Sequence, residues 1–190
     1  MRPRLRSART EQCSKSVREL LEGMQSSSES EDGKGPPNIL YTIAHHPTLL
    51  PPFLGFSATL AAGGVLNRRD AELLALRTSI NCRSPFEWGH HAEYGLAAGL
   101  NLEELNRIAK GPADPSWSPR DQLLLRACDQ LHAKQQISDE IYSALAGEFT
   151  EAQIVEAIFV IGHYTMLSMV ANATSVPLED RLPVMPDKSG

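Results

Sequence analysis

A carboxylate and two adjacent histidines fall within two turns of a helix that we expect to begin at Pro85. The stretch Ile80–Gly95 reads INCRSPFEWGHHAEYG. Glu87 and His91 are four residues apart and share one helix face, whereas His90 points about 100° away from His91. An adjacent carboxylate orients a histidine ring and raises its basicity, so the spacing suits a proton-transfer pair. From spacing alone, a solvated Glu–His pair on a helix surface is the commoner interpretation.

Metal binding is a weaker interpretation of the same residues. The HExxH signature of many zinc enzymes is absent from the sequence. The adjacent side chains of His90 and His91 cannot both reach one ion easily. A site built from Glu87, His91 and the distant His163 stays open as a lesser alternative. We expect no metal site.

Composition and charge narrow the classes of function. A chain of 190 residues suits one domain, and a formal net charge of -5 argues against a nucleic-acid binder. The three cysteines form no CxxC pair, which indicates free thiols in a reducing compartment. No run approaches the ~18 apolar residues of a spanning helix, and we find no secretory signal. We therefore expect a cytoplasmic protein that binds neither nucleic acid nor a membrane.

The reactive residues have to be positioned by helices, because no alternating strand pattern exceeds a few residues. Stretches 37–47 and 48–64 are predicted to be helical. Further helix starts are marked by a capping residue or an early proline: Asn67, Pro85, Asn101 with Glu104, Ser118 with Pro119, Ser138 and Thr150. In the helix after Asn67 one buried stripe is predicted, made of Ala71, Leu74, Ala75 and Thr78. The fold is predicted to be all-α, with about eight helices.

Three parts are expected along the chain. Residues 1–37 comprise an N-terminal helix or flexible arm and a linker, residues 38–180 the compact domain, and residues 181–190 a tail. In the arm, apolar residues recur at helical spacing: Val17, Leu20, Leu21 and Met24. The predicted last helix, 151–174, is apolar nearly all round, which indicates burial in the core and at a subunit interface. We therefore expect a homo-oligomer.

The run from Asp70 to Gly111, DAELLALRTSINCRSPFEWGHHAEYGLAAGLNLEELNRIAKG, resembles the carboxymuconolactone decarboxylase and alkylhydroperoxidase D superfamily. The resemblance extends over roughly residues 36–179. In the peroxidase branch, a glutamate precedes the first cysteine of a CxxC pair by twelve residues, and a histidine follows the second by four. On this chain the glutamate and histidine positions fall on Glu72 and His91, and the cysteine positions fall on Ser84 and Glu87.

The resemblance implies a helical fold like that of alkylhydroperoxidase D and an acid–base site without the cysteine pair. It implies a cofactor-free enzyme that decarboxylates, isomerises or hydrolyses a small organic acid or lactone. The decarboxylase reaction, and so a lyase, is expected first. The implied catalytic residues are Glu72, Glu87 and His91. Residues that could contact the substrate are Trp88, His163 and Tyr164, although Trp88 suits core or interface packing better. His90 is expected at the solvent or at a subunit contact.

The resemblance also implies an oligomeric state and two alternative functions. Members of the superfamily are usually trimers or hexamers, so we expect one of these first and a dimer second. One alternative is an antioxidant peroxidase of the alkylhydroperoxidase type, which would use Cys82 alone or with Cys128. The other is a non-catalytic helical oligomer that binds a ligand or partner through its last helix.

Overall fold

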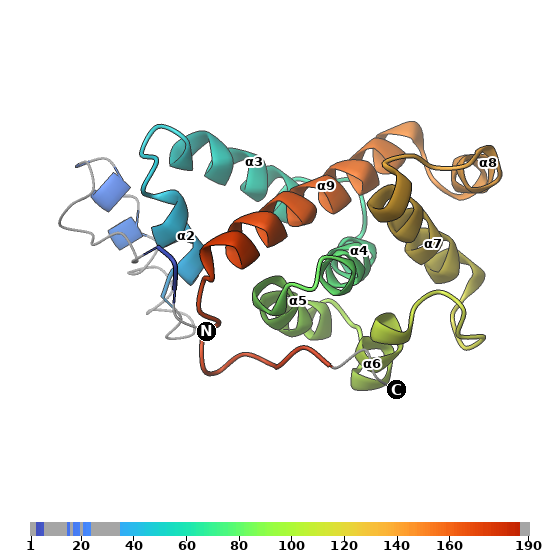
Figure 1. Cartoon of the computed structure of the whole chain (residues 1–190). Coiled ribbons are helices and arrows are strands. Elements are labelled where there is room, and N and C mark those ends of the chain that lie inside the picture. Colours follow the sequence, from blue (N-terminus) through green and yellow to red (C-terminus); the bar gives the residue numbers. More distant parts are fainter. Residues whose placement is uncertain (1–2, 6–14, 16, 20, 24–34, 187–190) are drawn as a thin grey trace.

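The structure is a computed structural model that describes residues 3–5, 15, 17–19, 21–23 and 35–186 (Figure 1). In the expected N-terminal helix, the described residues from 15 to 23 are helical, and Val17 and Leu21 are buried against the rest of the molecule. Leu20, Met24 and Cys13 lie outside the described residues, as does most of the expected linker.

The all-α fold is confirmed for the described part of the chain. From residue 38 on it contains α2 (Asn38–Ile43), α3 (Leu50–Ala62), α4 (Arg68–Asn81), α5 (Pro85–Ala97), α6 (Leu102–Lys110), α7 (Pro119–Lys134), α8 (Asp139–Glu148) and α9 (Glu151–Thr174). Each predicted start from Asn67 onward is observed, because the signals are local. The side chain of Asn67 accepts a hydrogen bond from the Asp70 amide, and Asn101 and Thr150 each form a complete capping box.

Helix α4 is the centre of the fold and contacts α5, α6, α7 and α9 (Figure 1). The sequence predicted a single buried stripe, but ten of its fourteen residues are buried, Asp70 and Glu72 among them. Because neighbours surround α4, its polar side chains have to be paired inside the protein. Glu72 is therefore both a buried core residue and a candidate catalytic residue.

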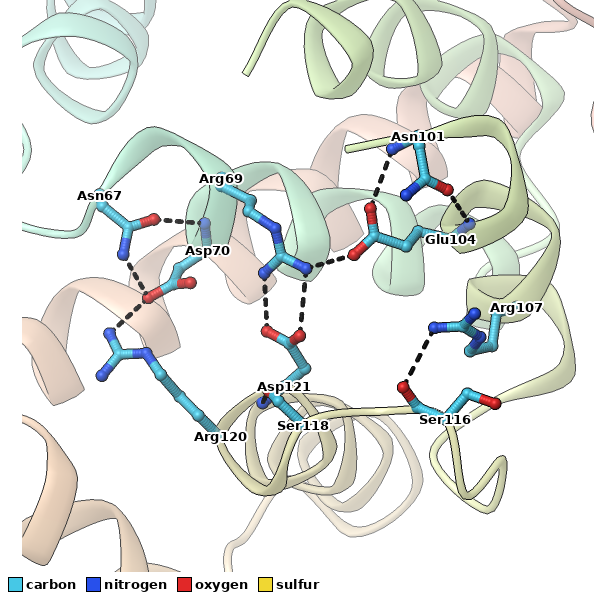
Figure 2. A network of polar contacts seen from close by, with 10 residues as sticks. All are labelled: Asn67, Arg69, Asp70, Asn101, Glu104, Arg107, Ser116, Ser118, Arg120 and Asp121. Carbon is cyan, nitrogen blue, oxygen red and sulfur yellow. Dashed lines mark hydrogen bonds and ion pairs between the residues drawn. The ribbon is translucent and has the colours of Figure 1, made fainter. Parts of the chain in front are cut away.

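A network of ion pairs fixes the N-terminal part of α4 (Figure 2). The guanidinium of Arg69 binds both carboxylate oxygens of Asp121 on α7, at 2.7 and 3.1 Å, and Glu104 on α6 at 2.5 Å. Arg120 reaches back from α7 to Asp70 at 2.6 Å. Bidentate pairs of this kind restrict the relative orientation of the elements that carry them. The network therefore holds α6 and α7 against the helix that carries Glu72.

Helix α9 was expected to be buried in the core and at a subunit interface, and in the single chain one face of it packs in the core. It contacts α2, α4, α5, α7 and α8 but exposes an apolar stripe of Val155, Ile158, Phe159, Met166 and Met169. By length and composition alone α9 also passes as a membrane span, with a mean hydropathy of 1.7, contrary to the expectation that no run would do so. Its other face supplies core residues and part of the cavity described below.

The segment after α9 packs along α5 and is tied to it at several points. Leu182 is buried, and Arg181 forms an ion pair with Glu93 at 2.8 Å. Glu179 accepts a hydrogen bond from the Asn38 amide at 2.8 Å, which joins this segment to the start of α2. Residues 181–186, in the expected tail, thus lie against the compact domain.

Candidate active site

The imidazole of His91 is held by the carboxylate of Glu72. Nδ1 of His91 on α5 lies 2.6 Å from Oε2 of Glu72 on α4, and both side chains are buried. The second oxygen, Oε1, binds the guanidinium of Arg68 at 2.6 Å. Since a carboxylate only accepts hydrogen bonds, Nδ1 carries the proton and Nε2 is left for chemistry. The Arg68–Glu72–His91 chain thereby fixes the tautomer.

The carboxyl group of Glu87 faces the other nitrogen of the same ring. Its Oε2 lies 3.8 Å from Nε2 of His91, one helical turn away on α5. Its Oε1 is buried without a hydrogen-bond partner among the described residues. Burial raises the pKa of Glu87 to about 7; the charge of His91 lowers it and that of Glu179 raises it. Glu87 can therefore hold or release a proton near neutral pH.

These groups open onto a cavity of about 340 Å³ between α2, α3, α4, α5 and α9. Its walls are mostly apolar, with side chains that include Leu40, Phe53, Leu54, Phe86 and Leu167. Its titratable lining residues are Arg68, Glu87, His90, His91, Tyr94, His163 and Tyr164. A small, largely apolar hollow with a few convergent polar groups is the usual form of a small-molecule site.

His163 and Tyr164 of α9 both line the cavity, beside His91. The Tyr164 ring contacts His91 edge-on at a centroid distance of 4.1 Å and His163 at 5.1 Å. Burial and the nearby charges of Glu72 and Glu87 raise the pKa of Tyr164, so its phenol stays protonated at neutral pH. Burial and then the charge of His91 lower the pKa of His163 to about 4, so its imidazole is neutral.

Trp88 lies in the core, as the sequence favoured, whereas His90 does not face the solvent. Trp88 packs in the larger core cluster and is not among the cavity residues. His90 was expected at the solvent or a subunit contact; in this chain it is 5% exposed, so the solvent-facing expectation is wrong. Its Nε2 lies 3.0 Å from Glu179 and its ring contacts Phe86 at 4.7 Å. The reason is the segment after α9, which covers this face of α5.

The two described cysteines form no hydrogen bond with the Arg68–Glu72–His91 chain. Cys82 is half-buried with its Sγ 3.8 Å from Nδ1 of His132, and Cys128 is fully buried beside Thr78. Burial raises the pKa of the Cys82 thiol, and it raises that of Cys128 to about 12. Among the described residues, no group of three or more His, Cys, Asp or Glu side chains is arranged to hold a metal ion.

Three polar groups of the site were not predicted from the sequence. Arg68 precedes Glu72 by four residues, so the helical spacing of an ion pair was present as a signal. Ser57, which lies 3.2 Å from Nε2 of His163, gave no signal, because the two residues are 106 positions apart. Tyr94 follows His91 by three residues on α5, and the two rings contact each other at 5.6 Å.

Part of the sequence matches a known protein family. Residues 47–130, which include α3 to α5 and Glu72, Glu87 and His91, match the model of the carboxymuconolactone decarboxylase family. This match covers less than half of the chain and includes the helices that carry the candidate residues. The expected resemblance is thus confirmed. A search of curated proteins gave no match.

Solved structures share the fold of this carboxymuconolactone decarboxylase-like chain over most of its length. A peroxidase-related protein from Ralstonia eutropha JMP134, described as an alkylhydroperoxidase AhpD core, has a TM-score of 0.80 at 16% identity, covering 94% of this chain and 93% of that one. A peroxidase-related protein from Silicibacter sp. TM1040 has the same score and identity, covering 95% and 94%. The debrominase Bmp8 has a TM-score of 0.71 at 14% identity, covering 87% of each chain.

Proposed function

We propose that the protein is an acid–base enzyme, acting as a lyase, isomerase or hydrolase on a small organic acid or lactone. The observation that carries the proposal is the chain Arg68–Glu72–His91–Glu87, which is buried from Glu72 onward and ends in the apolar cavity. It supplies a fixed base and a second group that titrates near neutral pH. The match of residues 47–130 to the carboxymuconolactone decarboxylase family supports an enzymatic role.

His91 is the proton-transfer group of the proposed reaction. With its Nδ1 proton held by Glu72, Nε2 can remove a proton from a carbon next to a substrate carbonyl. In a decarboxylation, the bond to the departing carbon dioxide breaks and its electron pair stays on the substrate as an enolate. A protonated Glu87 then returns a proton to that carbon, and the surrounding apolar wall keeps water away.

Arg68 suits the role of an anchor for the carboxylate of the substrate. It lines the cavity and is 42% exposed in its side chain, so a ligand can reach it. It donates to Glu72 and to the carbonyl of Ala61 at 2.9 Å, which leaves N–H groups of its fork for a ligand. A guanidinium there would also stabilise the negative charge of an enolate.

A cysteine-dependent peroxidase is the second candidate, supported by the two structural neighbours described as peroxidase-related. The cysteine positions of that branch are occupied by Ser84, whose side chain caps α5, and by Glu87. Raised thiol pKa values leave Cys82 and Cys128 little thiolate, the reactive form. This candidate predicts peroxide-dependent oxidation of a thiol donor that Cys82→Ser abolishes.

The proposal is tested by incubating the protein with 4-carboxymuconolactone and a panel of small carboxylates and lactones, with products followed by NMR. We expect turnover of at least one compound and its loss in His91→Ala. His46→Ala, at an exposed histidine after α2, is the matched control and should retain full activity. Unchanged turnover in a folded His91→Ala variant would overturn the proposal.

A further inference from the structure

A second polar pair lines the cavity and takes no part in the relay. Ser57 comes from α3 and His163 from α9, and Oγ of the serine lies 3.2 Å from Nε2 of the imidazole. His163 is 4% exposed. Its Nδ1 is buried and has no hydrogen-bond partner among the described residues. A buried polar atom without a partner is unfavourable, so its position in the cavity wall needs an explanation.

Aromatic neighbours fix the orientation of His163. The Phe53 ring stacks on the imidazole at a centroid distance of 5.6 Å and an interplanar angle of 26°. Phe56 and Tyr164 approach edge-on, at 5.1 and 5.1 Å. A ring packed in this way cannot turn to find another partner for Nδ1. The hydrogen bond to Ser57 is therefore a fixed feature of the cavity wall.

The tautomer of His163 decides what Ser57 can offer to a ligand. If Nδ1 carried the proton, a donor would be buried without an acceptor, and orphaned N–H groups are rarer in proteins than unpaired acceptors. The proton therefore lies on Nε2, which donates to Oγ of Ser57. The hydroxyl proton of Ser57 is then left to donate to a ligand.

The charge of this pair differs from that of Arg68. His163 is neutral, because burial and the charge of His91 disfavour its protonated form. Ser57 is also neutral, so the pair offers no charge to a carboxylate, whereas the guanidinium of Arg68 does. An acid with a second, uncharged oxygen can satisfy both groups.

We propose that Ser57 and His163 form a recognition site for a carbonyl oxygen that the substrate carries in addition to its carboxylate. The substrate class is then a keto acid rather than a simple hydrocarbon acid. Ser57 donates to the carbonyl, and His163 positions the serine hydroxyl. The inference rests on the proposed function in placing the carboxylate at Arg68.

The test is a binding experiment that needs no turnover. Calorimetry measures the dissociation constants of cyclohexanecarboxylate and of its 3-oxo and 4-oxo derivatives. We expect the wild type to bind at least one oxo acid about tenfold more tightly than the parent acid, the gain of one added hydrogen bond. Ser57→Ala and His163→Phe should lose this preference and bind the oxo acids no more tightly than the parent acid.

Thr59→Ala is the matched control, because Thr59 lies on the same helix and its hydroxyl donates to the carbonyl of Gly55 at an exposed position. It should retain the preference. A wild type without the preference, or Ser57→Ala with it, overturns the carbonyl site. Arg68→Met should weaken all three acids equally. A loss of turnover in His91→Ala alongside a missing oxo preference would leave the proposed function standing and remove only this inference.

Discussion

Glu72 decides which nitrogen of His91 carries the proton. Glu72→Gln keeps the shape of the side chain but replaces the oxygen pair that accepts the Nδ1 proton and binds Arg68. We expect kcat on any substrate found to fall by about 10²–10⁴-fold, the usual contribution of positioned acid–base groups. Nitrogen-15 NMR of the imidazole should show a changed tautomer. Glu103→Gln, at an exposed position on α6, should alter neither measurement.

Glu87 makes stability depend on pH with a predictable sign. Its pKa is about 7 in the folded protein and near 4.5 when unfolded, so between these values the folded state binds the extra proton. The contribution of Glu87 to the free energy of unfolding is fully present below pH 4.5 and is lost as pH rises through 7. The total is about 3 kcal/mol, since one pKa unit corresponds to about 1.4 kcal/mol.

Glu87→Gln removes this dependence and provides the measurement. Urea unfolding at pH 5, 6, 7 and 8 should show the wild type losing stability relative to Glu87→Gln as pH rises. Other titrating groups are common to the two proteins and cancel in the difference. A difference in unfolding free energy that stays constant from pH 5 to 8 would contradict the raised pKa of Glu87.

At the scale of elements, the close packing of α5 against the segment after α9 depends on a glycine. A Cβ added at Gly89 would lie 2.7 Å from Leu178 and 3.1 Å from the carbonyl of Pro183. We expect Gly89→Ala to destabilise the protein by about 1–3 kcal/mol, because overpacking forces the two elements apart. Thermal unfolding should show a Tm lower by several degrees.

Gly147→Ala is the control for that substitution. Gly147 lies on α8 and has no atom within 4 Å of an added Cβ. Alanine there should be neutral or stabilising by about 0.5–1 kcal/mol, since glycine disfavours a helix interior. Equal Tm values for the two variants would show that the contact at Gly89 carries no strain.

Helix starts could be predicted from the sequence because capping is local, as Asn67, Asn101 and Thr150 show. The family resemblance implied that Glu72 and His91 belong to one site, and left open whether Glu72 or Glu87 holds the imidazole. The partner of His90 could not be predicted, because Glu179 lies 89 positions away and reaches it only through tertiary packing. Helical spacing likewise placed residues on faces of α5 without showing that its surroundings bury most of them.

At the scale of the whole molecule, the apolar stripe of α9 leads us to propose a homo-oligomer, with a trimer or hexamer first and a dimer second. Val155, Phe159 and Met169 are each more than half exposed. Burying such a side chain contributes about 1.5–3 kcal/mol, so several together favour association. Light scattering should give a mass that is a multiple of 20.8 kDa.

Charged substitutions on the stripe test where the subunits meet. The double variant Val155→Asp with Met169→Asp should shift the mass to that of one chain, because two carboxylates would be buried at the contact. Tyr142→Asp, at an exposed residue of α8, should leave the mass unchanged. A wild type that stays at 20.8 kDa at micromolar concentration would rule out the oligomer.

The walls of the cavity come from segments that lie far apart in the sequence, so they are synthesised at different times. Glu72 and His91 are synthesised long before α9 supplies His163 and Tyr164, and Asn38 pairs with Glu179 across 141 positions. At about 5–20 residues per second, a nascent chain carries α4 and α5 for several seconds without their covering helix. The cavity around His91 is therefore complete only when α9 docks.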